Sequence, residues 1–62
     1  MNRLREIRLL RGLTQYQLAK LVGTSQARIW QWEHGYYIPK EEMKYALAKV
    51  LDVTVKELFP LE

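Results

Sequence analysis

The chain has 62 residues, with ten lysines and arginines against seven acidic residues, a formal net charge of +3 and no cysteine. This length allows one small domain over residues 1–62, and the lack of cysteine excludes disulfides and thiolate metal sites. With neither an apolar run of about 18 residues nor a signal peptide, a soluble, cytoplasmic protein is expected.

The charge is unevenly distributed along the chain. Residues 1–40 carry seven basic and two acidic side chains, whereas residues 41–62 carry three basic and five acidic ones. The basic part is suited to a polyanionic partner such as nucleic acid. Four arginines on a solvated helix face would be the alternative interpretation.

The first predicted helix spans residues 2 or 3 to 11. Asn2 is the expected N-cap, and Leu4, Ile7 and Leu10 recur at helical spacing as its inner stripe. Gly12 is typical of the residue that follows a helix in the left-handed conformation.

Two short amphipathic segments then flank Gly23. The first begins with Thr14 as N-cap and Gln17 three residues later, a capping-box pattern, and runs to residue 21 or 22. Ala19 is small enough for a close crossing by the next helix. This arrangement is the geometry of a helix-turn-helix, whose second helix lies in a DNA major groove. The crossing is expected to be held by Leu18, Ala19, Val22, Ile29 and Trp32.

The third predicted helix follows a cap at Thr24 or Ser25, runs to His34 and ends at Gly35. A loop over residues 36–39 precedes a fourth helix at residues 40–51. Its inner stripe is expected to be Met43, Ala46, Leu47, Val50 and Leu51.

A turn at residues 52–53 precedes a short fifth helix, residues 55–59. Thr54 is its expected N-cap and Glu57 its capping-box partner, and Pro60 stops it. No segment alternates with a period of two residues, so the predicted fold is all-α with five helices.

The exposed face of the third helix carries side chains that can read bases. Gln26, Ala27 and Gln31 point away from the inner side, flanked by Arg28 and Trp30. Glutamine pairs with adenine, arginine pairs with guanine, and an alanine methyl contacts a thymine methyl. A solvated helix with no partner could carry the same residue types.

The chain resembles the Cro/C1-type (XRE-family) helix-turn-helix domains of lambdoid phage repressors and small bacterial regulators. The resemblance covers about residues 4–59 and implies a compact, lambda-repressor-like five-helix fold. It also implies a sequence-specific double-stranded DNA-binding regulator, a repressor encoded by a bacterium, archaeon or phage. The matching residues are Arg8, Gly12 to Gln15, Leu18, Ala19, Val22, Gly23, Ser25, Gln26, Ile29, Trp32, Glu33, Gly35, Pro39, Leu47, Ala48, Leu51, Val53 to Val55 and Glu57 to Phe59.

The resemblance also implies roles for individual residues. Gln15 matches a glutamine that binds a DNA phosphate, and the loop from Tyr36 to Lys40 matches one that contacts phosphates. Arg8 and Glu33 match a pair that forms an internal salt bridge, which would make Arg8 structural. The residues expected to bind DNA are Gln15, Ser25, Gln26, Ala27, Arg28, Gln31, Tyr37 and Lys40.

Several positions depart from the family pattern. Leu9 and Leu10 stand where polar residues are usual, Lys44 stands where an apolar residue is usual, and Trp30 replaces a small or polar residue. Trp30 could wedge against the DNA backbone, or pack on the fourth helix or on a partner, and packing is favoured.

The alternative function is a protein-interaction module, such as an antitoxin or adaptor, that uses Leu9, Leu10, Trp30 and the apolar residues of the C-terminal region. A homodimer is expected, with contacts through the C-terminal region. Tyr45 and Phe59 are expected in the core or an interface. No catalytic constellation, cofactor motif or second metal ligand beside His34 is present, so neither an enzyme nor a metalloprotein is expected. The residues proposed for the dimer contact are Val55, Leu58, Phe59 and Leu61.

Overall fold

The computed structural model describes residues 2–60, and all regular structure within them is helical. The helices are α1 (Leu4–Leu10), α2 (Gln15–Val22), α3 (Gln26–Glu33), α4 (Glu41–Leu51) and α5 (Val55–Leu58). The predicted five-helix, all-α architecture is confirmed, with each boundary displaced by no more than about two residues. Within residues 2–60, no helix is both long and apolar enough to cross a membrane.

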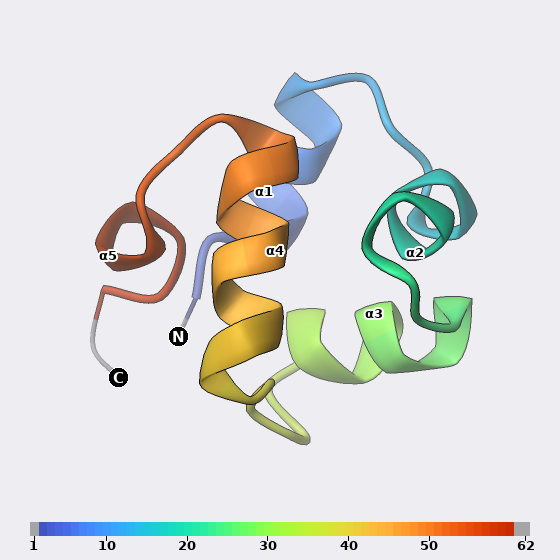
Figure 1. The fold of residues 1–62 in the computed structure, drawn as a ribbon. Helices are drawn as coiled ribbons and strands as arrows, with labels where there is room; N and C mark the ends of the chain where they lie inside the picture. The colour runs from blue at the N-terminus through green and yellow to red at the C-terminus, as the bar shows by residue number, and fades with distance from the viewer. Residues whose placement is uncertain (1, 61–62) are drawn as a thin grey trace.

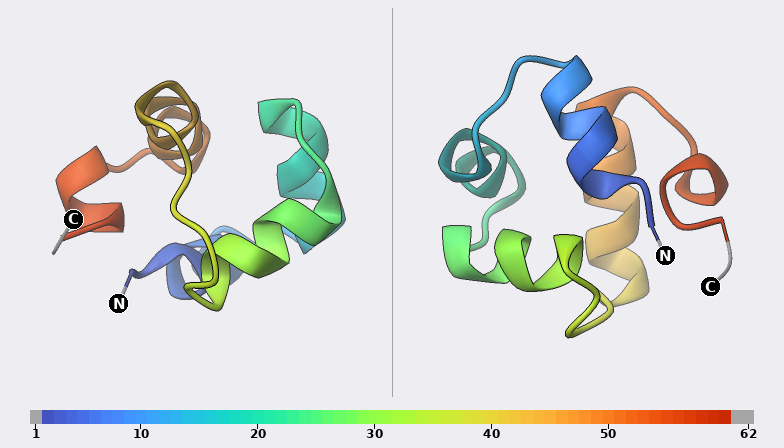
Figure 2. Two further views of the ribbon diagram at one scale, coloured as in Figure 1. Left: turned by 90° about the horizontal axis from the view of Figure 1, so that it is seen from below. Right: turned by 180° about the vertical axis from the view of Figure 1, so that it is seen from behind.

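The five helices form two sides around α1 and α4. Helix α4 lies in front of α1 in this view, with α5 on one side and the α2–α3 pair on the other (Figure 1). Helix α2 is seen nearly end-on while α3 runs across the view, so the two cross steeply. The views from below and behind keep α5 beside α4 and α2 beside α3 (Figure 2). Helix α3 therefore lies along one edge of the molecule.

Every helix contributes apolar side chains to one core. Leu13 in the loop after α1 and Val22 at the end of α2 pack against it. The buried apolar residues are Leu4, Ile7, Leu18, Ala19, Ile29, Trp32, Leu47, Ala48, Leu51, Leu58 and Phe59. All five residues predicted to hold the α2–α3 crossing belong to this core or pack against it.

Side-chain caps set the starts of three helices. In α2 the Thr14 hydroxyl accepts from the Gln17 backbone N–H at 3.0 Å, and the Gln17 side chain accepts from the Thr14 N–H at 2.9 Å. Thr54 and Glu57 repeat this box at α5. Two hydrogen bonds from Thr54 lower the pKa of the Glu57 carboxyl, with the larger effect from its backbone N–H and the smaller one from its hydroxyl. Ser25, rather than Thr24, caps α3.

The start of α1 differs from the prediction. Arg3 occupies the N-cap position and makes no side-chain cap bond. The Asn2 side chain instead accepts from the Leu4 N–H at 3.0 Å, from one residue further out, and donates to the Trp32 carbonyl at 2.8 Å. Asn2 thus satisfies the start of α1 while bridging to α3. The predicted inner position of Leu10 is wrong, because its side chain is 71% exposed and Arg8 is buried instead.

The turn between α2 and α3 depends on a backbone conformation that favours glycine. Gly23 ends α2 with a φ of 78°. A Cβ built there would meet nothing within 4 Å, so the torsion and not crowding selects glycine. Asp52 ends α4 with a φ of 58°, the single non-glycine residue with positive φ among residues 2–60.

The second half of the chain contradicts part of the predicted dimer contact. Leu58 and Phe59 are 0% and 3% exposed, so they fill this chain's own core and cannot form the expected dimer surface. Leu61 lies outside the described residues. Tyr45, which was expected in the core or an interface, is exposed, so only the interface alternative stays open for it. Lys44 is buried in the α4 stripe, with its ammonium 3.4 Å from a Glu41 oxygen and 5.4 Å from the centre of the Phe59 ring.

Candidate nucleic-acid interface

Helix α3 presents two different faces. Ile29, Trp32 and Glu33 are buried against the other helices. Gln26, Ala27 and Arg28 are exposed, and Gln31 is half-buried at the edge of the same outer face. This phase agrees with the helical periodicity. The outer face therefore offers amides, a methyl and a guanidinium.

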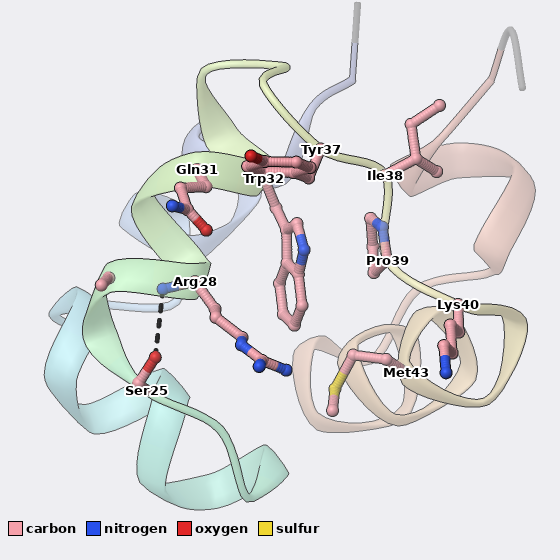
Figure 3. Close-up of a pocket in the computed structure, with 10 residues that line it drawn as sticks. Ser25, Arg28, Gln31, Trp32, Tyr37, Ile38, Pro39, Lys40 and Met43 are labelled. Carbon is pink, nitrogen blue, oxygen red and sulfur yellow. Dashed lines mark hydrogen bonds between the residues drawn. The ribbon is translucent and has the colours of Figure 1, made fainter.

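A first hollow lies between α3 and the start of α4. It has a volume of about 650 Å³ and is lined by Ser25, Ala27, Arg28, Gln31, Trp32, Tyr37, Ile38, Pro39, Lys40 and Met43. Figure 3 shows the side chain of Arg28 reaching from α3 toward α4. Two cations, Arg28 and Lys40, thus border a groove that has no carboxylate in its lining.

A second hollow lies between α2 and α3. It has a volume of about 380 Å³ and is lined by Gln15, Gln26, Ala27, Trp30 and Gln31. Ala27 and Gln31 belong to both hollows. All eight residues expected to bind DNA therefore line one continuous part of the surface.

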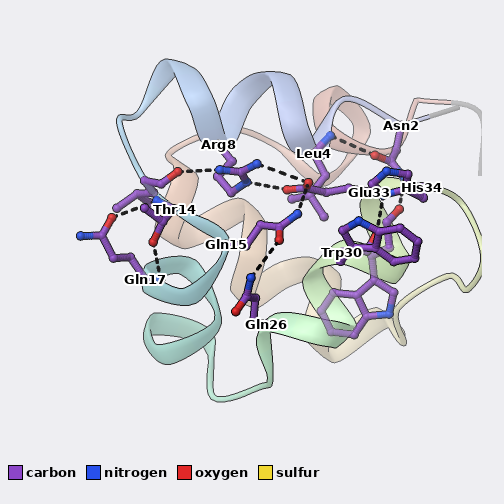
Figure 4. Close-up of polar contacts among 12 residues, drawn as sticks. Asn2, Leu4, Arg8, Thr14, Gln15, Gln17, Gln26, Trp30, Glu33 and His34 are labelled. Atoms are coloured by element: carbon purple, nitrogen blue, oxygen red, sulfur yellow. Dashed lines mark hydrogen bonds and ion pairs between the residues drawn. The ribbon is translucent and has the colours of Figure 1, made fainter.

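A chain of polar contacts joins the core to this surface (Figure 4). Glu33 accepts from the Arg8 Nε at 2.5 Å and from Nη2 at 3.3 Å, and their side chains are only 0% and 7% exposed. The Gln15 amide donates to Glu33 Oε1 at 3.0 Å, and its own oxygen accepts from the Gln26 amide at 3.3 Å. The orientation of an exposed glutamine on α3 is thus set by a buried carboxylate.

Arg8 also binds the loop between α1 and α2. Its Nη1 donates to the Leu13 carbonyl at 2.7 Å, which fixes the loop between α1 and α2. No buried side-chain nitrogen or oxygen within residues 2–60 lacks a hydrogen-bond partner. Arg8 is therefore part of the scaffold, as expected from the resemblance.

Internal contacts use much of the basic charge of residues 1–40. Arg3 pairs with Glu6, which lowers the pKa of that carboxyl through hydrogen bonding and then through charge. Arg11 donates from its Nε to the Leu51 carbonyl at 2.7 Å, at the end of α4. The cations at the candidate interface are Arg28 and Lys40. The simple charge count therefore overstated how much of the positive charge faces one partner.

Trp30 is not part of the core and stacks on its neighbours in and after α3, whereas packing on a partner stays a prediction. Its side chain is 43% exposed and stacks on His34, with ring centres 4.0 Å apart, and on Tyr36, at 5.5 Å. The His34 Nδ1 lies 2.8 Å from the Trp30 carbonyl. These three rings form an aromatic stack at the C-terminal half of α3.

Two features of this surface were missed by sequence reasoning. The hydrogen bond from Gln26 to Gln15 joins residues eleven positions apart, whereas the family resemblance predicts only a phosphate contact for Gln15. The first hollow is also lined by Ile38, Pro39 and Met43, which are not among the residues predicted to bind DNA. Ile38 and Pro39 lie in the loop that the family resemblance places against DNA phosphates, whereas nothing in the sequence indicates that Gln15 and Gln26 are bonded to each other.

Metal ligation has no support in this part of the chain. Residues 2–60 contain no group of three or more histidine, cysteine, aspartate or glutamate side chains placed to hold an ion. The nitrogen Nδ1 of His34 is already close to a backbone carbonyl.

Curated relatives are similar over nearly the whole chain. One from Archaeoglobus fulgidus, named as an HTH-type transcriptional regulator and itself uncharacterised, is 39% identical over 58 residues, which cover 94% of this chain and 83% of the relative. Another of the same description from Methanocaldococcus jannaschii is 36% identical over 61 residues, covering 98% and 92%.

A solved structure has the same fold. The P22 c2 repressor, crystallised with a synthetic operator, matches with a TM-score of 0.84 and 35% identity, over 87% of this chain and 82% of that one. The helix-turn-helix family model matches residues 4–58. These matches and the α2–α3 geometry show that the chain belongs to the Cro/C1-type helix-turn-helix family.

Proposed function

We propose that this protein is a transcriptional regulator, a repressor, that binds double-stranded DNA in a sequence-specific manner with α3 in the major groove. The observation that carries the proposal is the single surface formed by the two hollows, where amide, guanidinium and methyl groups of α3 meet the cations beside it. The curated relatives are named as transcriptional regulators, and the P22 c2 repressor is bound to an operator in its crystal structure.

Base reading would fall to the outer face of α3. Gln26 and Gln31 would each pair with an adenine, and Arg28 with a guanine. Because Glu33 and Gln15 hold the Gln26 amide from behind, that side chain would lose little rotamer freedom on binding DNA. Ala27 would contact a thymine methyl.

Phosphate binding would flank this reading face. Gln15 and Ser25 lie at the starts of α2 and α3, where backbone N–H groups and helix dipoles favour anions. Tyr37 and Lys40 border the first hollow from the other side. Such contacts position a protein on the duplex without reading sequence.

A repressor of this kind would act in the cytoplasm as a symmetric dimer. Two copies of α3 about 34 Å apart would read successive turns of the major groove. Leu58 and Phe59 are unavailable for the dimer contact, so it would have to use other exposed side chains.

A protein-interaction module remains the second candidate, and one observation favours it. Leu9 and Leu10 are exposed side by side near the end of α1, away from the core. Contiguous exposed apolar surface, to which both leucines would contribute, marks sites that contact another protein. In that case the same fold would serve as an antitoxin or adaptor.

The experiment that separates these functions is selection of bound sites from random double-stranded DNA, followed by binding measurements. The wild type should select one motif, and its affinity should fall steeply with salt, with a log–log slope of about −0.9 per neutralised phosphate. The double variant Gln26→Ala, Gln31→Ala should lose preference for the motif, by about 1–3 kcal/mol at each position read.

The matched control is Glu42→Ala, Lys49→Ala, which changes two exposed residues of α4. This control should keep both the motif and the affinity. Failure of the wild type to enrich any sequence, or an unchanged motif in the glutamine variant, would contradict the proposed function. Under the protein-interaction alternative, the glutamine variant keeps full partner binding.

A further inference from the structure

The side chain of Trp30 stands at the reading face without a structural duty in the core. Helix α3 buries Ile29 and Trp32 on either side of it in sequence, yet Trp30 itself is 43% exposed. It forms one wall of the second hollow, together with Gln26 and Ala27 of the same helix and Gln15 of α2. A partly exposed aromatic side chain in the lining of a hollow is placed to contact a ligand that enters the hollow.

The indole is restrained by its neighbours rather than free to rotate. It stacks on the rings of His34 and Tyr36, with interplanar angles of 24° and 13°. The contact between the His34 Nδ1 and the Trp30 carbonyl keeps the imidazole beside it. An indole that is already ordered loses little entropy when it contacts a ligand.

The lining of the second hollow divides by chemistry. Gln15, Gln26 and Gln31 supply amides, whereas the methyl of Ala27 and the indole of Trp30 supply the apolar part. Of the groups that base pairs present in the major groove, the thymine 5-methyl is the apolar one. Glutamine reads adenine, and the partner of adenine carries that methyl group.

We propose that Trp30 is a specificity-determining residue whose indole, with the Ala27 methyl, forms an apolar subsite for the 5-methyl group of a thymine. This inference rests on the proposed DNA-binding function and deepens it. The subsite makes the protein distinguish thymine from uracil and from cytosine at one position, in addition to the amide contacts to adenine.

The test uses the full chain and the DNA site that it selects. Each thymine of the site is replaced in turn by deoxyuridine, which removes the methyl group and leaves base pairing unchanged. Dissociation constants are measured by fluorescence anisotropy for the wild type, Trp30→Ala, Trp30→Gln and the matched control Tyr45→Ala. Tyr45 is an exposed aromatic residue of α4 that lines neither hollow.

At one thymine or more, the wild type and Tyr45→Ala should bind the deoxyuridine-substituted DNA about fourfold more weakly than the unsubstituted site, as expected for the loss of one buried methyl group. In Trp30→Ala and Trp30→Gln the difference at that thymine should fall to about twofold or less, because only the Ala27 methyl remains, and thermal unfolding should remain close to wild type. Two variants of different chemistry keep the test informative if one folds poorly.

Three outcomes overturn the inference. The first is a selected motif in which no deoxyuridine weakens binding, and the second is a methyl effect that stays as large as in the wild type in both Trp30 variants. In these two cases sequence-specific binding itself stands. The third outcome, a wild-type chain that selects no sequence at all, overturns the proposed function together with the subsite.

Discussion

The buried ion pair between Arg8 and Glu33 gives the sharpest prediction about stability. We consider the variants Arg8→Met and Glu33→Leu and their combination. Each single change leaves the remaining charge buried without its partner, because both side chains are almost completely covered. Removing one member of such a pair costs about 3–5 kcal/mol. A chain of this length has a total stability of roughly 3–9 kcal/mol, so either single variant should be close to unfolding.

The double variant should be more stable than either single variant. It removes both charges and replaces them with apolar groups, which is often neutral or stabilising for a buried pair. Two hydrogen bonds are also lost, from Arg8 to the Leu13 carbonyl and from Gln15 to Glu33, at about 1 kcal/mol each. The net cost of the double change is therefore about 1–3 kcal/mol.

The assay is urea unfolding followed by circular dichroism for all four proteins, analysed as a double-mutant cycle. The expected result is a coupling of several kcal/mol, with the double variant between the wild type and the singles. Additive losses, or single variants that each lose less than about 1 kcal/mol, would refute the claim that the pair is buried and mutually dependent.

Four further predictions concern two helix ends, a capping carboxylate and a surface cation. Replacing Asp52 with glycine should stabilise the chain by up to about 1 kcal/mol, because glycine adopts a φ of 58° without steric cost. Gly23→Ala should lower stability by about 1–2 kcal/mol, because alanine is strained at the positive φ of this position. The midpoints of urea unfolding test both predictions. The pKa of the Glu57 carboxyl is lowered in the folded state, so its contribution to the free energy of unfolding is present above pH 4.5, the ordinary pKa of the group, and is lost as the pH falls through the lower folded pKa. Glu57→Gln should therefore lose less stability than the wild type when the pH is lowered between these two pKa values. Equal losses in the two proteins would contradict this prediction. Lys40→Ala should reduce the salt slope of DNA binding by about one, whereas Lys49→Ala, at the other end of α4, should leave it unchanged in the same titration.

Sequence alone predicts the helices well because their ends are encoded locally. Thr14 with Gln17 and Thr54 with Glu57 are short-range patterns, and both form the capping boxes that they indicate. The left-handed residue Gly23 is equally local. The phase of α3 follows from its buried residues Ile29 and Trp32, since helical spacing fixes the opposite face.

The predictions that failed depend on contacts between distant segments. Leu10 has the right spacing for the core, but no other element covers that side of α1. Phe59 appeared available for a partner because the sequence does not show that α4 and α5 pack together over it. Lys44 is buried through its aliphatic stem while its ammonium finds Glu41 and an aromatic ring.

The candidate site shows the same division. Helical spacing and the family resemblance brought the eight expected residues to one surface, yet neither could reveal how that surface is held. The link from Arg8 through Glu33 and Gln15 to Gln26 joins α1, α2 and α3. The direction of Trp30 was open for the same reason, because its stacking partner Tyr36 lies in an irregular loop.

The bridge made by Asn2 has a practical consequence for handling the protein. Its amide joins the first turn of α1 to the Trp32 carbonyl near the end of α3, so the beginning of the chain is mechanically connected to the reading helix. An affinity tag or fluorophore fused ahead of α1 therefore sits where it can shift that helix. Labels for binding assays are better attached to an exposed side chain of α4, such as Lys49, than to the amino-terminal residues.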